Sequence, residues 1–110
     1  MIYHITTRAD WERQADRDEY EAVSLATEGF IHLSTQEQIA GVLERYYPES
    51  RSRPGGISDL LMLHVDPNQL THDLRYELST NNEHFPHLYG PLNKDAVVTV
   101  TVVQGTSPGV

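Results

Sequence analysis

The chain has 110 residues, no cysteine and a formal net charge of −8, from 16 acidic and 8 basic residues. This length predicts one domain with a single hydrophobic core, and the absence of cysteine excludes disulfides, thiolate zinc sites and a cysteine nucleophile. The acidic surface argues against duplex nucleic acid and anionic membranes as partners, although one arginine or a helix N-terminus would hold a small phosphorylated ligand.

The two ends of the chain bear on its localisation and extent. No basic segment followed by an apolar one comes after Met1, and no apolar run has the length of a membrane span. We therefore expect a soluble, cytoplasmic protein. Residues 1–103 are expected to form the domain, and residues 104–110, which contain glycine, serine and proline, are expected to form a flexible C-terminal tail.

The first elements are predicted from the alternation of polar and apolar residues. Residues 2–6 alternate as in a strand, which places His4 and Thr6 on one face. Thr7 is expected to cap a charged helix that follows this strand. Residues 20–25 then form either a further strand or an extended segment that leads into the next motif.

The next motif is predicted to be a short buried strand that runs directly into a helix. Residues 30–33 form the strand, and His32 and Ser34 share one of its faces. Ser34 and Glu37 have the spacing of a capping box, in which the serine begins the helix. The helix carries an apolar stripe at helical spacing, formed by Ile39, Val42, Leu43 and Tyr46.

Strands dominate the second half of the chain. A polar loop is predicted for residues 49–57, and residues 59–65 are apolar on both faces, which predicts a central strand. Residues 74–78 form another strand, residues 85–91 a rigid loop fixed by its prolines, and residues 96–103 a β-branched strand. This order, with two main helices early and strands late, predicts a single compact α+β domain with a split or strongly curved, mixed or antiparallel sheet.

Three imidazoles in apolar, turn-bounded segments are the first candidates for a site. Taken singly, His4, His32 and His87 each fit either a core histidine hydrogen-bonded to the backbone or a ligand-binding residue. A helix start behind His32 offers free amides to an anion, and rigid aromatic loops such as the one that carries His87 and Tyr89 often line sites. The three together predict one shared pocket.

Arg75 and Glu77 face the same way on their predicted strand. In a functional interpretation, Arg75 clamps a phosphate or carboxylate, and Glu77 binds a ribose hydroxyl or acts as a base. A solvated salt bridge between the two is the commoner arrangement. Of the other histidines, His64 is expected to pack, whereas His72 and His84 are expected to be exposed to solvent.

Four motifs, in this order, resemble a known bacterial family. They are Tyr3-His4-Ile5-Thr6, Glu28-Gly29-Phe30-Ile31-His32-Leu33-Ser34-Thr35, Leu74-Arg75-Tyr76-Glu77 and Phe85-Pro86-His87-Leu88-Tyr89-Gly90-Pro91-Leu92. The family is domain of unknown function 952, and the likeness covers nearly the whole chain apart from its C-terminal tail. The resemblance implies a fold similar to that of the ADP-ribosyltransferases, which bind NAD in a cleft between two sheet halves.

The resemblance also implies that NAD is the ligand and the substrate. His4 and Thr6 on the first strand would contact the ribose on the nicotinamide side. His32 and Ser34 would fill the corresponding position on the second strand.

The catalytic residues that the resemblance implies are His32, Glu77 and His87. Glu77 would orient the ribose and stabilise the developing oxocarbenium charge. His87 would take that part if Glu77 faced away from the cleft, which would weaken the case for transferase activity. Tyr89 would line the nicotinamide side together with His87, and Arg75 would bind the ligand.

Three functions are compatible with these residues. The first is an NAD- or nucleotide-binding, ADP-ribosyltransferase-like enzyme in which His4, His32 and His87 line one cleft. The second is a non-catalytic module that binds a small molecule or nucleotide in the same cleft. The third is a metalloprotein in which the three histidines bind zinc or iron, although their spacing does not require it and no metal is expected.

Overall fold

The computed structural model describes residues 1–46 and 59–103, so the predicted loop 49–57 and the predicted tail 104–110 lie outside the described residues. None of the helices in these two ranges has the length and apolar composition needed to span a bilayer. The helices are α1 (Arg8–Arg13), α2 (Val23–Glu28) and α3 (Ile39–Tyr46). The strands are β1 (Ile2–Thr7), β2 (Glu19–Tyr20), β3 (Ile31–His32), β4 (Leu60–Val65), β5 (Asp73–Leu78), β6 (His84–Tyr89), β7 (Leu92–Asn93) and β8 (Val97–Val102).

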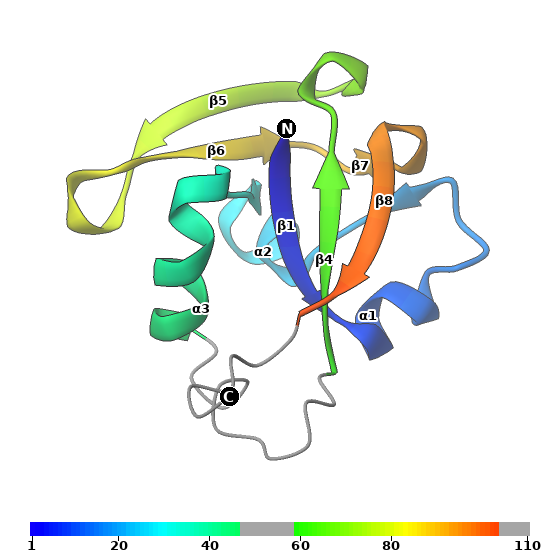
Figure 1. Ribbon diagram of the computed structural model, residues 1–110. Helices are drawn as coiled ribbons and strands as arrows, with labels where there is room; N and C mark the ends of the chain where they lie inside the picture. The colour runs from blue at the N-terminus through cyan, green and yellow to red at the C-terminus, as the bar shows by residue number, and fades with distance from the viewer. Residues whose placement is uncertain (47–58, 104–110) are drawn as a thin grey trace, which may run out of the picture.

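Two three-stranded antiparallel sheets form the frame of the molecule. One has the order β1-β4-β8 and the other β3-β6-β5, while β2 and β7 pair as a small ribbon. In Figure 1, β5 and β6 run across one end of the first sheet. The two sheets meet where the backbones of Tyr3 and Ser34 exchange two hydrogen bonds of 2.8 Å. The predicted α+β class with antiparallel sheets is confirmed.

The main hydrophobic core fills the space between the two sheets. Ile2 and Val65 from the first sheet pack in one cluster with Ile31 and Leu88 from the second. Each such side chain contributes roughly 1.5–3 kcal/mol when it is fully buried. The same cluster is completed by Tyr20, Leu33, Leu63, Leu92 and Ala96.

Helix α3 packs against a second apolar cluster. Ile39 and Leu43 pack against a group that contains Ile5, Leu60 and Val103. These two residues belong to the predicted apolar stripe. Strand β4 is the middle strand of its sheet, and residues of β4 take part in both apolar clusters. Both observations agree with the prediction of a central strand that is apolar on both faces.

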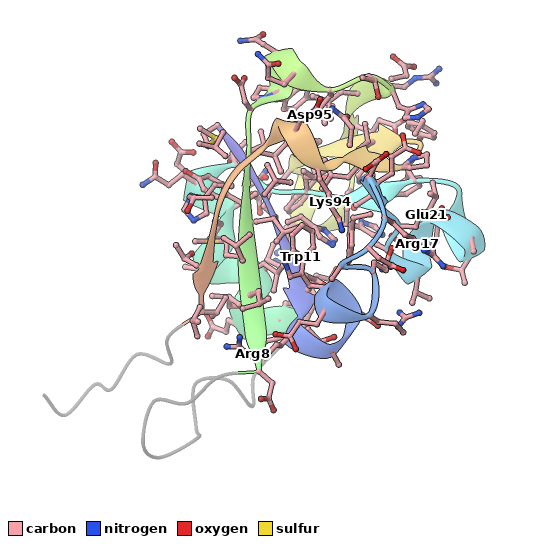
Figure 2. The ribbon with its side chains drawn as sticks, turned by 90° about the vertical axis from the view of Figure 1, so that its right-hand side faces the viewer. Arg8, Trp11, Arg17, Glu21, Lys94 and Asp95 are labelled. Atoms are coloured by element: carbon pink, nitrogen blue, oxygen red, sulfur yellow. The ribbon has the colours of Figure 1, made fainter. Side chains whose placement is uncertain are left out.

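Helix α1 starts at the predicted cap and is tied to a distant part of the chain. The Thr7 side chain accepts the Asp10 N–H at 3.1 Å, which satisfies a free amide of the first turn. Lys94, the only lysine of the chain, donates to the Gln14 carbonyl and lies 5.1 Å from the centre of the Trp11 ring. Trp11 and Lys94 lie side by side in Figure 2. The single lysine therefore has a structural role.

The segment 20–25 differs from its prediction. Only Glu19 and Tyr20 form a strand, and Val23–Glu28 is a third helix. The helix ends at Gly29, whose φ of +90° is in the left-handed region that glycine adopts without strain. Val23 is exposed to solvent in this helix, although a β-branched apolar residue in the sequence favours a buried strand. The prediction of a strand is therefore understandable from the sequence.

The capping box is present one residue later than predicted. Thr35 and Gln38 form it, and the short 3₁₀ turn Gln36–Gln38 leads into α3. Ser34 cannot be the cap, because its backbone N–H and C=O are both paired with Tyr3 and the residue is buried.

The predicted rigid loop 85–91 is wrong over most of its length. His84–Tyr89 forms β6, the central strand of its sheet, and it pairs with β3 on one side and β5 on the other. A proline is tolerated there because Pro86 lies opposite the end of β3, where its carbonyl accepts the Leu33 N–H at 3.0 Å. Because β3 ends at His32, the hydrogen bond that Pro86 cannot donate would lie just beyond the end of this strand.

Candidate functional site

A pocket of about 520 Å³ lies where β1, β3, α2 and α3 meet. Its volume is within the range of roughly 300–1,000 Å³ that is typical of small-ligand sites. Its acidic groups are Asp10 and Glu28, and no arginine or lysine of the described residues lines it. The lining residues are His4, Ile5, Thr6, Thr7, Asp10, Tyr20, Ala22, Val23, Ser24, Glu28, His32, Leu33, Ser34, Val42, Tyr46, Ser79 and Phe85.

One wall of the pocket is a buried chain of polar groups centred on His4. Its Nδ1 lies 2.6 Å from the His32 carbonyl oxygen, and its Nε2 lies 3.0 Å from the Tyr20 hydroxyl. The Tyr20 hydroxyl is also 2.8 Å from Thr6 Oγ1. This chain connects β1, β2 and β3 behind the pocket.

The protonation of His4 follows from these contacts. A carbonyl oxygen only accepts, so His4 Nδ1 carries the proton. Burial lowers the pKa of His4 to about 4, against the opposing effect of the hydrogen bond to the His32 backbone. The ring is therefore neutral at neutral pH. Its Nε2 accepts a hydrogen bond from the Tyr20 hydroxyl, and the Tyr20 oxygen in turn accepts a hydrogen bond from the Thr6 hydroxyl.

Replacing Tyr20 with phenylalanine is expected to destabilise the fold by about 1–3 kcal/mol, because His4 Nε2 and the Thr6 hydroxyl would be left buried without this partner. Urea unfolding of the wild type and the variant measures this loss. Tyr76→Phe, at a position that is 52% exposed, is the matched control and is expected to change stability by less than about 0.5 kcal/mol. Equal effects of the two substitutions would contradict the role of the Tyr20 hydroxyl.

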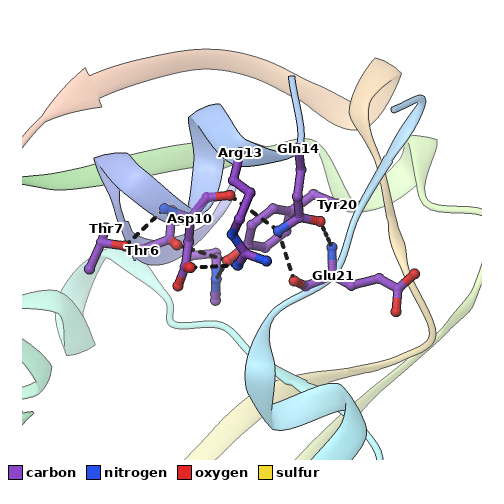
Figure 3. Close-up of polar contacts among 8 residues, drawn as sticks. Thr6, Thr7, Asp10, Arg13, Gln14, Tyr20 and Glu21 are labelled. Carbon is purple, nitrogen blue, oxygen red and sulfur yellow. Dashed lines mark hydrogen bonds and ion pairs between the residues drawn. The ribbon is translucent and has the colours of Figure 1, made fainter. Parts of the chain in front are cut away.

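Tyr20 is positioned by the connection between α1 and β2. The Gln14 side chain is buried and donates to the carbonyls of Asp10 and Glu21 at 3.2 and 3.1 Å. Its amide oxygen accepts the Glu21 N–H at 2.8 Å. Figure 3 shows Gln14 reaching from α1 to the chain next to Tyr20. Arg13, on the same helix, pairs with the pocket carboxylate of Asp10 at 2.6 Å.

The mouth of the pocket holds a carboxylate–imidazole pair. His32 Nε2 lies 3.0 Å from Glu28 Oε2, and each side chain is about half exposed, at 49% and 50%. Glu28 is the last residue of α2, and the turn at Gly29 brings it back towards β3. This pair is the ionisable couple that a ligand in the pocket would meet.

A second polar cluster lies on the β5–β6 surface and adjoins the pocket at His32. His87 Nδ1 lies 2.9 Å from Glu77 Oε1, and the Tyr89 hydroxyl donates to the same oxygen. The hydrogen bonds from Tyr89 and His87 lower the pKa of Glu77, and the bond to Glu77 raises the pKa of Tyr89. The Arg75 guanidinium lies 4.8 Å from the centre of the Tyr89 ring.

His87 is enclosed within this cluster. It is 4% exposed, and the Phe30 ring stacks on it with a centroid distance of 4.1 Å and an interplanar angle of 22°. The His32 ring meets it edge-on at 5.3 Å. His32 thus belongs to both regions: it lines the pocket, and its ring contacts His87 of the β5–β6 cluster.

Comparison with known proteins places the chain in a family. Residues 5–100 match the model of a family described as "Protein of unknown function (DUF952)". The chain belongs to this family. The DUF952 match begins one residue after His4 and runs into β8, so it includes the other residues of both polar clusters, and it carries no activity with it. A search of curated proteins gives no match.

Solved structures with the same fold are found as well. A crystal structure of protein CC0527 from Caulobacter crescentus is 32% identical, covers 99% of this chain and 90% of its own, and has a TM-score of 0.80. A double-mutant form of CC0527 is 31% identical over the same shares, also with a TM-score of 0.80. The solution structure of CC0527 is 31% identical, covers 98% of this chain and 88% of its own, and has a TM-score of 0.70. The α+β fold of this DUF952 chain is therefore shared with a solved relative.

The predicted site residues of this DUF952 protein divide into two groups. Those brought together in the pocket are His4, Thr6, His32 and Ser34. Those placed in the β5–β6 cluster, outside the pocket lining, are Arg75, Glu77, His87 and Tyr89. The expectation that three histidines line one cleft holds for two of them, because Phe30 covers the third.

The Arg75–Glu77 salt bridge is not formed. Arg75 Nε pairs with Asp73 at 2.7 Å, and Glu77 is held by the β6 side chains. Both residues were correctly placed on one strand face, but each finds a different partner.

The other three histidines lie as the sequence predicts. His64 is half-buried, bonds to Thr101 at 2.9 Å and packs edge-on against Tyr3, while His72 and His84 are exposed as expected. No group of three or more His, Cys, Asp or Glu side chains in ranges 1–46 and 59–103 is placed to hold a metal ion. Of the histidines proposed as metal ligands, His4 uses both ring nitrogens in hydrogen bonds within the protein. His32 pairs with Glu28 through Nε2, and His87 pairs with Glu77 through Nδ1.

Two pocket residues of this DUF952 protein were missed as site candidates. The sequence pattern predicts Tyr20 only as the start of a strand, and it presents Glu28 only as part of a family motif. The signal for Glu28 is the glycine that follows it, because Gly29 ends a helix and leaves Glu28 in the last turn, four residues before His32. For Tyr20 we find no local signal, since its partners come from β1.

Proposed function

We propose that the pocket binds the nicotinamide–ribose part of NAD or of a related nucleotide, in an ADP-ribosyltransferase-like protein. The observation that supports this most is that His4, Thr6, His32 and Ser34 line one pocket. These are the residues that the motif resemblance connects with the ribose. Their hydroxyls and imidazoles suit sugar hydroxyls, and the apolar wall that includes Phe85 suits a planar ring.

The charge of the lining favours one part of the dinucleotide over the rest. The oxidised nicotinamide ring is positively charged, and the carboxylates of Asp10 and Glu28 would attract it. The same carboxylates would repel phosphates; Arg13 offsets Asp10 from outside the lining, whereas no arginine or lysine of the described residues lines the pocket itself. The proposal therefore puts the ring and its ribose inside the pocket and the phosphates outside it.

Glu28 is the carboxylate proposed to act on the glycosidic bond. When that C–N bond breaks, its electron pair leaves with nicotinamide, which becomes neutral, and positive charge develops on the ribose carbon. Glu28 would stabilise this charge, and His32, 3.0 Å away, would hold the carboxylate in position. A water or another hydroxyl then bonds to the ribose carbon and releases its proton.

A non-catalytic binding module is the second candidate. Glu77, to which the resemblance assigns charge stabilisation, lies outside the pocket lining and is bonded to His87 and Tyr89. This position favours a pocket that holds a nucleotide without cleaving it.

Incubation with NAD is expected to release nicotinamide, and Glu28→Gln is expected to slow the release roughly 10²-fold, since it removes a charge that acts in the transition state. Nicotinamide is measured by chromatography, and NAD affinity is measured by calorimetry on the same samples. Glu37→Gln, at an exposed residue of the turn before α3, is the matched control and is expected to leave the rate unchanged.

The outcomes separate the two candidates. Saturable binding of NAD without nicotinamide release supports the binding module. If neither NAD nor nicotinamide riboside binds to the protein, the pocket is not a nucleoside site and both candidates are rejected.

A further inference from the structure

His87 Nε2 has a property that the proposed function leaves unexplained. Among the described residues, it is the one buried side-chain nitrogen or oxygen without a hydrogen-bond partner. A buried polar group without a partner is unfavourable, and native structures contain few of them. The position therefore points to a partner that comes from outside the chain.

The contacts of His87 define what that partner must be. Glu77 accepts at Oε1, 2.9 Å from Nδ1, so the proton of the neutral ring is on Nδ1. Nε2 then has a lone pair and accepts a hydrogen bond. The Tyr89 hydroxyl binds the same Glu77 oxygen and holds the carboxylate in place. This arrangement fits the N–H or O–H group of a ligand.

His87 lies next to residues that line the pocket. On β6, His87 lies two residues from Phe85, on the same face of the strand, and it is the cross-strand partner of His32. Both Phe85 and His32 line the pocket. The Phe30 ring, stacked at 4.1 Å, covers the imidazole and is itself only half-buried. His87 thus adjoins the pocket through Phe85 and His32, and displacement of the Phe30 ring, which is not part of the pocket lining, would uncover the imidazole.

We infer that His87 Nε2 is the acceptor of a second subsite, which adjoins the pocket, takes a neutral N–H or O–H donor of the ligand and is covered by Phe30 in its absence. The inference rests on the proposed function, in which the pocket holds a nicotinamide ring whose carboxamide carries such donors. Glu77 and Tyr89 are positioning residues in this subsite. Phe30 follows Gly29, whose left-handed backbone marks the turn between α2 and β3.

Nicotinamide and 3-acetylpyridine form a matched pair of probes, because both are neutral and carry a carbonyl but only nicotinamide has amide N–H donors. The ¹⁵N resonances of the His87 ring, followed in labelled wild-type protein, report hydrogen bonding at Nε2 directly. Nicotinamide is expected to shift Nε2 while Nδ1 stays protonated, and to bind roughly tenfold more tightly than 3-acetylpyridine. His87→Phe is expected to abolish this preference.

A measurement without ligand tests the cover. Deuterium exchange at the imidazole C2 position is expected to be slow for His87 in the wild type and several-fold faster in Phe30→Ala, with His4 unchanged as the internal control. Exchange at His87 as fast as at the exposed His84 in the wild type would overturn the closed subsite.

Different results would disprove the second subsite and the pocket. Nicotinamide that shifts the resonances of Ser34 and Phe85 but leaves His87 Nε2 unchanged, with equal affinity for both probes, would overturn the second subsite and leave the pocket proposal standing. If neither probe shifts any pocket resonance, both are overturned.

Discussion

Acidification from pH 6.5 to pH 4 is expected to lower the free energy of unfolding by about 3 kcal/mol through His4 alone. The pKa of His4 is lowered to about 4 in the folded protein because the ring is buried. Between these two pH values the unfolded chain binds a proton at His4 and the folded protein does not, so unfolding is favoured as the pH falls. Above pH 6.5 His4 is neutral in both states, and its contribution to stability is fully present.

The control for this prediction is His4→Gln. Glutamine does not titrate, and its amide can still donate to the His32 carbonyl. Glu77, whose pKa is lowered by hydrogen bonds from Tyr89 and His87, loses its stabilising contribution in acid in both proteins, so it cancels in the difference. Urea unfolding of the two proteins across the pH range isolates His4. An identical acid-induced loss in both would refute the prediction.

Leu88→Ala is expected to destabilise the protein by about 2–5 kcal/mol, because it leaves a cavity in the main core. Leu88 is fully buried in the central strand of its sheet, with Ile31 opposite it on β3 and Leu74 opposite it on β5. The loss would therefore weaken the packing of both neighbouring strands. Thermal or urea unfolding measures the effect.

Leu78→Ala is the matched control for that substitution. Leu78 lies in the neighbouring strand β5 but is 60% exposed, so its truncation is expected to change stability by less than about 0.5 kcal/mol. A small effect at Leu88, comparable with that at Leu78, would contradict the central position of β6.

The parts of the fold that were predicted correctly have local signals. β1 alternates in polarity, Thr7 is a helix-capping residue, and β4 is apolar on both faces. Each of these properties is set by neighbouring residues, so the sequence alone is sufficient to reveal it.

The parts that were missed depend on contacts between distant residues. Pro86 argues against a central strand, and only the position of Leu33 opposite it shows why the proline is tolerated. Helix α2 is only six residues long, too short for a clear helical pattern, and it begins with Val23, a residue that favours strands but is exposed here. The capping box moved to Thr35 because Ser34 is paired with β1, an interaction across 31 residues that no local pattern indicates.

The grouping of the candidate residues in space could be predicted only in part, for the same reason. Strand alternation placed His4 with Thr6 and His32 with Ser34, and these four residues line the pocket. Alternation also placed Arg75 with Glu77, but the partners of Glu77 come from β6, a segment for which the sequence predicts a loop. Whether a side chain faces a pocket or a covered neighbour, as His87 does beneath Phe30, is decided by packing between elements.

The joint between the two sheets has a consequence for how relatives should be compared. Tyr3 and Ser34 connect the sheets, and His4 and His32, which lie close to this joint on the two sheets, both line the pocket. A change in the angle between the sheets would alter the width of the pocket without any substitution in its lining. A difference in this angle between family members would therefore change the pocket even where its side chains are the same, and superposing each sheet separately would reveal it.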